Sequence, residues 1–334
     1  MNLMSKKVSI AIIDSGVDDR IEKIKTCITA GFTISQVNSN NRIIEDHYED
    51  VFGHGTNCAD VILKNFSQVE FIPIKIVDNN GFSNSELLME ALKLCTKLPV
   101  KMFCASLSVI TKEYQKEKSL YEICQCLDAQ NKIICVSEDN NNMLSIPAKF
   151  DNVIGVRAIY SKYLLQVKKN SPIQVYADGT PVFAVNGRGT YNLFKGSSKA
   201  NADVVGKIAA LLYHKPDSKR AEVLRALGNK YGNQLCGPRE NTLNRIPSGK
   251  IQFKIARDLC CIINAMQHKG LDVIQLSQVP IMSPFTGVTY FNVYDLLEQV
   301  RNYYGGKRIS YEELNVDQIC TLYNFVHYVQ EELL

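Results

Sequence analysis

The chain has 334 residues, 46% of them hydrophobic, and a formal net charge of +4, values that are typical of an ordinary globular protein. The positive charge is spread along the chain without a long basic block, so the sequence does not indicate a nucleic-acid-binding protein. There is no run of about 18 apolar residues, which argues against a membrane-spanning helix. The length is sufficient for one large domain and a small one.

The cysteines and the start of the chain bear on its location. Eleven cysteines are irregularly spaced, and pairs such as Cys124/Cys126 and Cys260/Cys261 do not have the spacing of zinc ligands. We therefore expect free thiols, no metal site and no cofactor. The start, MNLMSKKVSIAIID, lacks the apolar region and cleavage site of a signal peptide. These features predict a cytoplasmic protein.

The first predicted strand ends in a carboxylate. Residues 8–13 form a nearly continuous apolar run, which is typical of a strand covered on both faces in a parallel sheet. Asp14 follows it directly. Because open α/β sheets place their functional groups at the carboxyl ends of strands, Asp14 is a candidate site residue. The alternative is a turn residue or a helix cap.

A histidine stands next at the start of a predicted helix. Residues 31–50 are polar and rich in turn formers, and Gly53, His54 and Gly55 follow before the helical stretch NCADVILKNF. The two small neighbours leave the imidazole accessible and allow another backbone to approach closely. His54 is therefore a candidate catalytic residue, and a structural or solvated histidine is the alternative.

Strands and helices then alternate. Ser83, with Glu86 three residues later, predicts a helix N-cap and capping box. Further strands are predicted at 71–77, 102–109, 132–137 and 151–159, and helices at 83–97 and 112–130. This alternation over about 210 residues predicts a doubly wound parallel α/β sheet with helices on both faces.

The segment from Phe194 to Tyr213 begins with the turn Gly196-Ser197-Ser198 and continues with apolar residues at helical spacing. A serine at a helix N-terminus lies beside free N–H groups and the positive end of the helix dipole, which favour developing negative charge. This position suits a nucleophilic hydroxyl and its oxyanion. The alternative is that Ser197 or Ser198 caps the helix.

Asp14, His54 and Ser198 follow one another in the chain order that is known for subtilisin. The sequences around them, IIDSGVD, GHGTNCADVI and GSSKANADVVGKIAALL, resemble the three catalytic motifs of the subtilase family of serine peptidases. The resemblance covers about residues 6–230. It implies that Ser198 is the nucleophile, that His54 is the general base and acid, and that Asp14 orients the imidazole.

The resemblance also implies an oxyanion hole. An ungapped alignment from Ala129 places Asn140 where the family has its oxyanion asparagine, and the Ser198 backbone N–H would be the second donor. Asn141 or Asn142 would take this role if the loop contained a gap. Residues 199 and 202 differ from the family, because Lys199 and Ala202 replace its usual apolar residue and proline.

The first specificity pocket of subtilases has two walls, which here would be Ser106-Leu107-Ser108 and Ser137-Glu138-Asp139. Glu138 and Asp139 replace small neutral residues of the family. A carboxylate that faces a partly desolvated cleft attracts a cationic side chain, so cleavage after Lys or Arg is one expectation. The alternative is that both acids point to solvent.

The chain after the region of resemblance has a different composition and pattern. Residues 233–250 contain glycine, proline and mixed charge and predict a linker between a peptidase domain at 1–232 and a small helical domain at 251–334. Helical stretches at 253–268, 291–304 and 316–333 form that domain, whose layout resembles a carrier protein, with Phe291 near the position of the phosphopantetheine-bearing serine. It would dock a protein partner, or else pack as a stabilising appendage.

The sequence thus predicts an intracellular serine endopeptidase that acts on a peptide or protein substrate and processes a specific precursor. The alternative is an inactive binding protein on the same scaffold, acting through its helical C-terminal domain.

Overall fold

The computed structural model describes residues 7–37, 40–109, 113–141, 143–232 and 241–334. The chain falls into two compact units. The larger unit comprises the described residues of 1–180, 185–190 and 195–236, and the helical unit comprises those of 181–184, 191–194 and 237–334. None of the described helices is long and apolar enough to cross a membrane.

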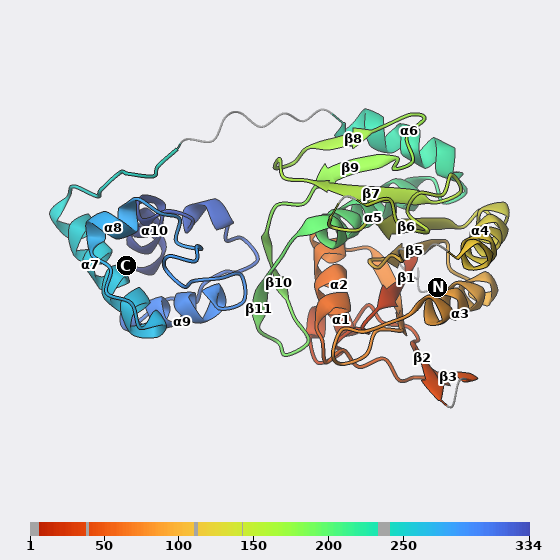
Figure 1. Cartoon of the computed structure of the whole chain (residues 1–334), viewed down its shortest axis with the longest axis horizontal. Helices are drawn as coiled ribbons and strands as arrows, with labels where there is room; N and C mark the ends of the chain where they lie inside the picture. Colours follow the sequence, from red (N-terminus) through yellow and green to blue (C-terminus); the bar gives the residue numbers. More distant parts are fainter. Residues whose placement is uncertain (1–6, 38–39, 110–112, 142, 233–240) are drawn as a thin grey trace, which may run out of the picture. The chain divides into compact units, whose positions relative to one another are not determined.

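The larger unit is built on a nine-stranded sheet of order β3-β2-β4-β1-β5-β6-β7-β9-β8 (Figure 1). Its seven inner strands are parallel, and the two edge strands, β3 and β8, pair antiparallel with their neighbours. The strands are β1 (Val8–Asp14), β2 (Phe32–Val37), β3 (Asn40–Glu45), β4 (Val69–Lys75), β5 (Met102–Ala105), β6 (Ile133–Ser137), β7 (Ile154–Ile159), β8 (Leu165–Val167) and β9 (Val175–Asp178). This confirms the predicted α/β class.

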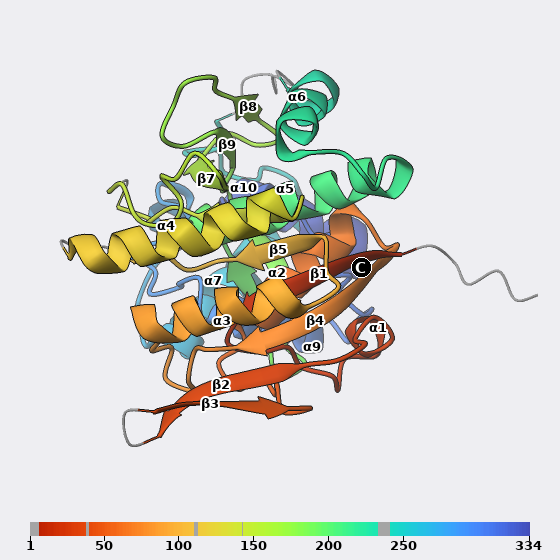
Figure 2. The same cartoon turned by 90° about the vertical axis from the view of Figure 1, so that its right-hand side faces the viewer.

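Helices cover both faces of this sheet (Figures 1 and 2). On one face lie α2 (His54–Asn65) and α5 (Gly196–His214), and on the other lie α3 (Ser85–Lys97) and α4 (Tyr114–Ala129). The short α1 (Glu22–Lys25) and α6 (Arg220–Tyr231) complete the unit. Fully buried side chains such as Leu88, Phe103 and Leu120 fill the space under α3 and α4, as the apolar runs of the strands require.

The N-terminus of α3 differs from its prediction. Asn84, not Ser83, is the N-cap, and its side chain accepts the backbone N–H of Leu87 at 2.9 Å. The Ser83 hydroxyl donates instead to the Ile76 carbonyl at 2.8 Å. Asparagine and serine are about equally good caps, so the sequence alone did not distinguish the two neighbours.

The helical unit has its own apolar core. Its helices are α7 (Lys250–Gln267), α8 (Val273–Ser277), α9 (Val293–Tyr303) and α10 (Leu322–Tyr328), with a 3-10 turn at Val316–Gln318 and a π-helical turn at Val329–Leu333. Side chains such as Leu259, Ile263, Leu297, Val300 and Phe325 are fully buried in it. The sequence predicted the longest of these helices.

A β-hairpin from the middle of the chain also contributes to this core. Its strands are β10 (Val182–Val185) and β11 (Tyr191–Phe194). The side chains of Phe183 and Leu193 are buried among the helices of the helical unit, and the ring of Tyr191 stacks on Tyr311 at a centroid distance of 4.8 Å. The predicted boundaries at 232 and 251 did not include this hairpin.

Candidate active site

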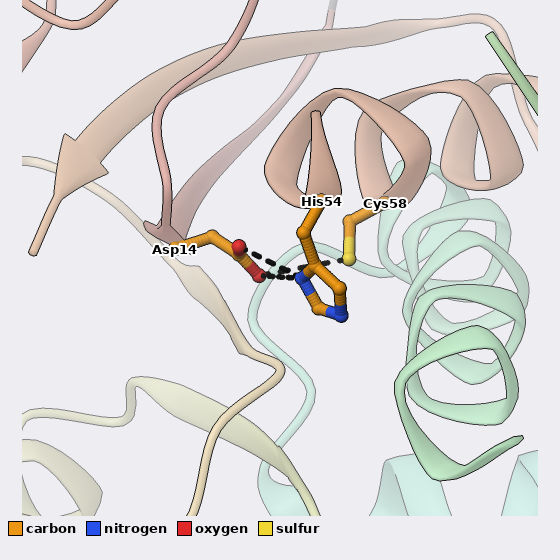
Figure 3. A group of neighbouring side chains, drawn as sticks. All are labelled: Asp14, His54 and Cys58. Atoms are coloured by element: carbon orange, nitrogen blue, oxygen red, sulfur yellow. Dashed lines mark hydrogen bonds and ion pairs between the residues drawn. The ribbon is translucent and has the colours of Figure 1, made fainter. Parts of the chain in front are cut away.

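Asp14 and His54 form a hydrogen-bonded pair at the carboxyl end of the sheet. His54 Nδ1 lies 2.8 and 2.9 Å from the two carboxylate oxygens of Asp14 (Figure 3). Asp14 is 1% exposed, whereas the His54 side chain is 28% exposed. Burial lowers the pKa of His54, but the charge and the hydrogen bond of Asp14, with a contribution from Asp50, raise it further, so the pKa lies above its usual value of 6.5.

Local sequence explains why these two side chains meet. Gly53 has a φ of +92°, which glycine adopts without strain. A Cβ on Gly55 would lie 2.1 Å from the carbonyl oxygen of Gly16 and 3.0 Å from the Cβ of Asp14. Because glycine has no side chain, the first turn of α2 can approach the end of β1 closely enough for His54 to reach Asp14.

Asp50 anchors the same helix start, and the sequence analysis missed it. Its Oδ1 accepts the Gly53 N–H at 2.7 Å, and its Oδ2 accepts the Thr56 N–H at 2.9 Å and the Thr56 hydroxyl at 2.6 Å. These bonds satisfy N–H groups that the first turn of a helix leaves without helical partners. An acidic residue shortly before a helix start was the available signal.

Ser197 and Ser198 occupy different environments at the start of α5. Ser197 is 2% exposed, and its hydroxyl accepts the Ala158 N–H at 3.4 Å. Ser198 is half-buried, and its hydroxyl donates to the Ser106 carbonyl at 3.4 Å. The N-cap is Lys195, so neither serine has the predicted capping role. Ser198 is therefore the more accessible hydroxyl of the two.

Asn140 lies beside this turn. Its Oδ1 accepts the Ser197 N–H at 2.9 Å. Gly196 has a φ of +81°, and a Cβ there would lie 2.7 Å from the same oxygen. This contact occupies the amide oxygen and leaves the Nδ2 group, a donor, for another molecule. Asn141 is exposed and donates its backbone N–H to Asp139, and Asn142 lies outside the described residues.

Glu138, which belongs to one of the two predicted pocket walls, is turned inward. Its carboxylate is buried and forms two hydrogen bonds with the Arg157 guanidinium, of which Nη2–Oε1 measures 2.6 Å. The charge of the carboxylate is thus balanced by Arg157 inside the protein, which argues against its predicted contact with a substrate cation. Asp139 is half-buried, and its Oδ1 accepts the Asn141 N–H at 2.8 Å.

The other wall residues are buried or half-buried. Ser106 and Ser137 are 7% and 3% exposed. Leu107 packs against the core under α3 and α4, and Ser108 is half-buried. The Ser106 carbonyl accepts the Ser198 hydroxyl, so this wall adjoins the nucleophile candidate.

Cys58 lies one helical turn after His54 and was not singled out from the sequence. Its thiol donates to the Ser106 hydroxyl at 3.4 Å and to Asp14 Oδ2 at 3.8 Å. The potential metal ligands of Asp14, His54 and Cys58 all lie within 4.8 Å of one another (Figure 3). Burial raises the pKa of this thiol well above its usual value, which disfavours the thiolate that metals bind. The contacts of these three residues are those of a hydrogen-bonded Asp14–His54 pair with the Cys58 thiol as a further donor to Asp14.

Most of the chain is similar to known proteins. The family model described as the subtilase family matches residues 5–244. The chain belongs to the subtilase family. Subtilisin DY of Bacillus licheniformis is 24% identical over 242 residues, which are 68% of this chain and 84% of that protein. Residues after 244 lie outside the family match.

Two further proteases and one solved structure are also similar to part of this chain. The cell wall-associated protease of Bacillus subtilis (strain 168) is 25% identical over 234 residues, 64% of this chain but only 24% of that protein. The intracellular serine protease of Paenibacillus polymyxa is 21% identical over 61% of this chain and 66% of its own length. The crystal structure of a cold adapted subtilisin-like serine proteinase has a TM-score of 0.57 at 16% identity and covers 70% of this chain and 86% of that chain. The match to this structure shows the subtilisin-like fold.

Proposed function

We propose that this subtilase is an active serine endopeptidase with the catalytic residues Asp14, His54, Ser198 and Asn140. The observation that supports this most is the Asp14–His54 hydrogen bond at 2.8 Å, at the carboxyl end of the strand from which the first motif comes. An accessible serine starts α5, and a side-chain amide lies beside it. These are the groups that acyl transfer requires.

In the proposed reaction the Ser198 oxygen attacks the scissile carbonyl carbon, and His54 Nε2 takes the hydroxyl proton. His54 then gives this proton to the leaving amine, and water releases the acyl group by the same steps. Asp14 accepts the Nδ1–H and stabilises the imidazolium. Since the Ser198 hydroxyl donates to the Ser106 carbonyl in the structure, it must rotate away from that carbonyl to react.

The oxyanion would be bound by the Asn140 Nδ2 group and the backbone N–H of Ser198. Both are donors at or near the N-terminus of α5, where the helix dipole favours negative charge. Loss of one side-chain donor costs about 2.7–4 kcal/mol, a magnitude established for subtilisin, a member of the same family.

We further propose that the enzyme works inside the cell on a specific precursor peptide or protein. The ten cysteines that the structure describes are free thiols, as expected in a reducing compartment. Residues 245–334 of the helical unit lie beyond the family match, and the unit would bind the substrate or a protein partner through residues 251–334.

A second candidate is a binding protein on an inactive subtilase scaffold. It is favoured by the bond of the Ser198 hydroxyl to the Ser106 carbonyl, which does not activate a nucleophile.

Labelling with a fluorophosphonate probe separates the two candidates. The probe reacts covalently with an activated serine and needs no knowledge of the substrate. We expect labelling of the full chain, loss of labelling in Ser198→Ala, and retained labelling in the matched control Ser197→Ala. No labelling of the folded wild-type chain would favour the inactive scaffold.

A further inference from the structure

Lys199, the residue after the nucleophile, is buried and ion-paired. It is 4% exposed, and its Nζ donates to the Asp178 carbonyl at 2.9 Å and lies 3.3 Å from Asp178 Oδ2. Asp178 is 6% exposed and ends β9. The family resemblance places an apolar residue at position 199, so this chain has a buried charge where its relatives usually have none.

The Asp178 carboxylate is fully engaged. Its Oδ1 accepts the Thr180 N–H at 2.7 Å, and its Oδ2 accepts the Tyr163 N–H at 3.0 Å. Burial alone would raise the pKa of Asp178, but the Lys199 charge and these hydrogen bonds outweigh it and hold the pKa below its usual value. The Asp178 carboxylate is therefore ionised at neutral pH.

A buried ion pair contributes little net stability to a protein core. The free energy required to remove two charges from water offsets much of the attraction between them. Apolar side chains of similar volume are often at least as stabilising. The groups that the Lys199–Asp178 pair holds in place therefore matter more than its net contribution to stability.

The groups beside this pair belong to the candidate oxyanion hole. Gly179 follows Asp178, and its carbonyl accepts the Gly196 N–H at 3.0 Å. Gly196 has a positive φ, and the next N–H, that of Ser197, donates to Asn140 Oδ1. Lys199 thus ties the first turn of α5 to the same end of β9 that holds Gly196 in position.

We propose that the Lys199–Asp178 ion pair positions the Gly196–Ser197 turn, and through it the Ser198 nucleophile and the Asn140 amide. Lys199 is a positioning residue, because it acts through the backbone of this turn and through Asn140. The inference rests on the proposed peptidase function for its kinetic consequence, and on the structure alone for its effect on the turn.

The kinetic test uses the full chain and a fluorophosphonate probe at a temperature at which all variants are folded. In Lys199→Met, which keeps the length of the side chain, we expect the maximal inactivation rate to fall about 10- to 100-fold, because small misplacements of reacting groups have effects of that size. The half-saturating probe concentration should change less than about twofold, since binding is not affected. Lys207→Met is the matched control, because Lys207 lies on the same helix and pairs with Asp203.

A coupling measurement separates positioning from general weakening of the fold. If Lys199 acts through Asn140, then Asn140→Ala should slow the Lys199→Met variant much less than it slows the wild-type chain. Losses that multiply would contradict the proposal. If Lys199→Met does not fold, Asp178→Asn, which retains the carbonyl that accepts Lys199, takes its place.

Hydrogen–deuterium exchange tests the turn without any reaction. We expect the Gly196 and Ser197 amides to exchange faster in Lys199→Met and to remain unchanged in Lys207→Met. Unchanged exchange in Lys199→Met, or an unchanged inactivation rate, would overturn the proposal. Lack of probe labelling in the wild-type chain would instead contradict the proposed function, and the exchange result would still decide the role of Lys199.

Discussion

The side-chain oxygen of Asn140 accepts the backbone N–H of Ser197 at 2.9 Å. This one bond orients the amide, because the oxygen is engaged by the protein and the nitrogen is left to donate. It also links the loop after β6 to the turn that carries the proposed nucleophile. The expected consequences of this arrangement can be measured separately.

Asn140→Ala should lower kcat about 100- to 1000-fold and change KM little, because the donor acts on charge that develops in the transition state. Asn140→Asp is a useful comparison, since it retains an oxygen for the Ser197 N–H but offers no donor. We expect a loss at least as large. Steady-state kinetics on a model peptide would check this, and full activity of Asn140→Ala would exclude the proposed role.

Gly55→Ala tests the close approach of α2 to β1. The added Cβ would lie 2.1 Å from the Gly16 carbonyl oxygen. Either α2 must therefore move away from β1, or the surrounding backbone must become strained. Overpacking of this kind typically costs about 1–3 kcal/mol of unfolding free energy. We expect a lower Tm and a large loss of probe labelling, because the shift separates His54 from Asp14. Gly270→Ala, with open space around it, is the control.

The pH dependence of the reaction should follow from the raised pKa of His54. The imidazole must be neutral to act as a base, so activity should fall as the pH falls through a pKa above 6.5. In Asp14→Asn the charge that raises the pKa is gone while burial still lowers it. The midpoint of the acid limb should then shift to lower pH, and the maximal rate should drop by about four orders of magnitude.

The Asp14–His54 pair also makes the unfolding free energy depend on pH, and this dependence runs opposite to that of activity. A group whose pKa is raised by folding stabilises the folded state at pH values below its unfolded pKa, and this contribution is lost as the pH rises through the folded pKa. The Asp14–His54 contribution to the unfolding free energy should therefore be complete below a pH of about 6.5 and disappear above the raised pKa. Chemical denaturation of wild type and His54→Ala across this range would detect it; a constant difference would contradict it.

Deleting residues 241–334 should do more than remove a separate domain. Phe183 and Leu193 are buried in the core of the helical unit, and the deletion would expose them. Full burial of such side chains contributes about 1.5–3 kcal/mol each, so we expect a poorly soluble product. Phe183→Ser combined with Leu193→Ser should partly restore its solubility. A truncated chain as soluble as the full one would show that the hairpin does not need the helical unit.

Glu138→Gln tests the inward orientation of this side chain. Because the buried carboxylate pairs with the Arg157 guanidinium, the substitution should lower stability and affect cleavage after Arg and after Leu equally. Asp139→Asn tests the remaining carboxylate of this wall. If Glu138→Gln alone lost cleavage after Arg but kept cleavage after Leu, Glu138 would contact a substrate cation as the sequence predicted.

Sequence patterns predicted the buried parallel strands and the amphipathic helices, because both have strong periodicities. The strands β2 and β3 were not predicted, because they lie in the polar, turn-rich residues 31–50. Asp14, His54 and Ser198 were singled out by their positions at strand ends and helix starts. Contacts between distant segments outside the proposed catalytic residues were not predicted. The pairing of Glu138 with Arg157 depends on the register of β6 and β7, and the burial of Phe183 and Leu193 depends on helices more than 50 residues further along the chain. Neither has a local signal.

The most direct test of the central claim is digestion of an unstructured peptide library by the purified full chain, with the products identified by mass spectrometry. Wild type and Ser198→Ala should be compared at equal folded concentration. We predict that the wild-type chain produces new peptide termini and that Ser198→Ala produces none above background. Equal cleavage by both proteins would show that another group or a contaminant is responsible, and no cleavage by either would contradict an active endopeptidase.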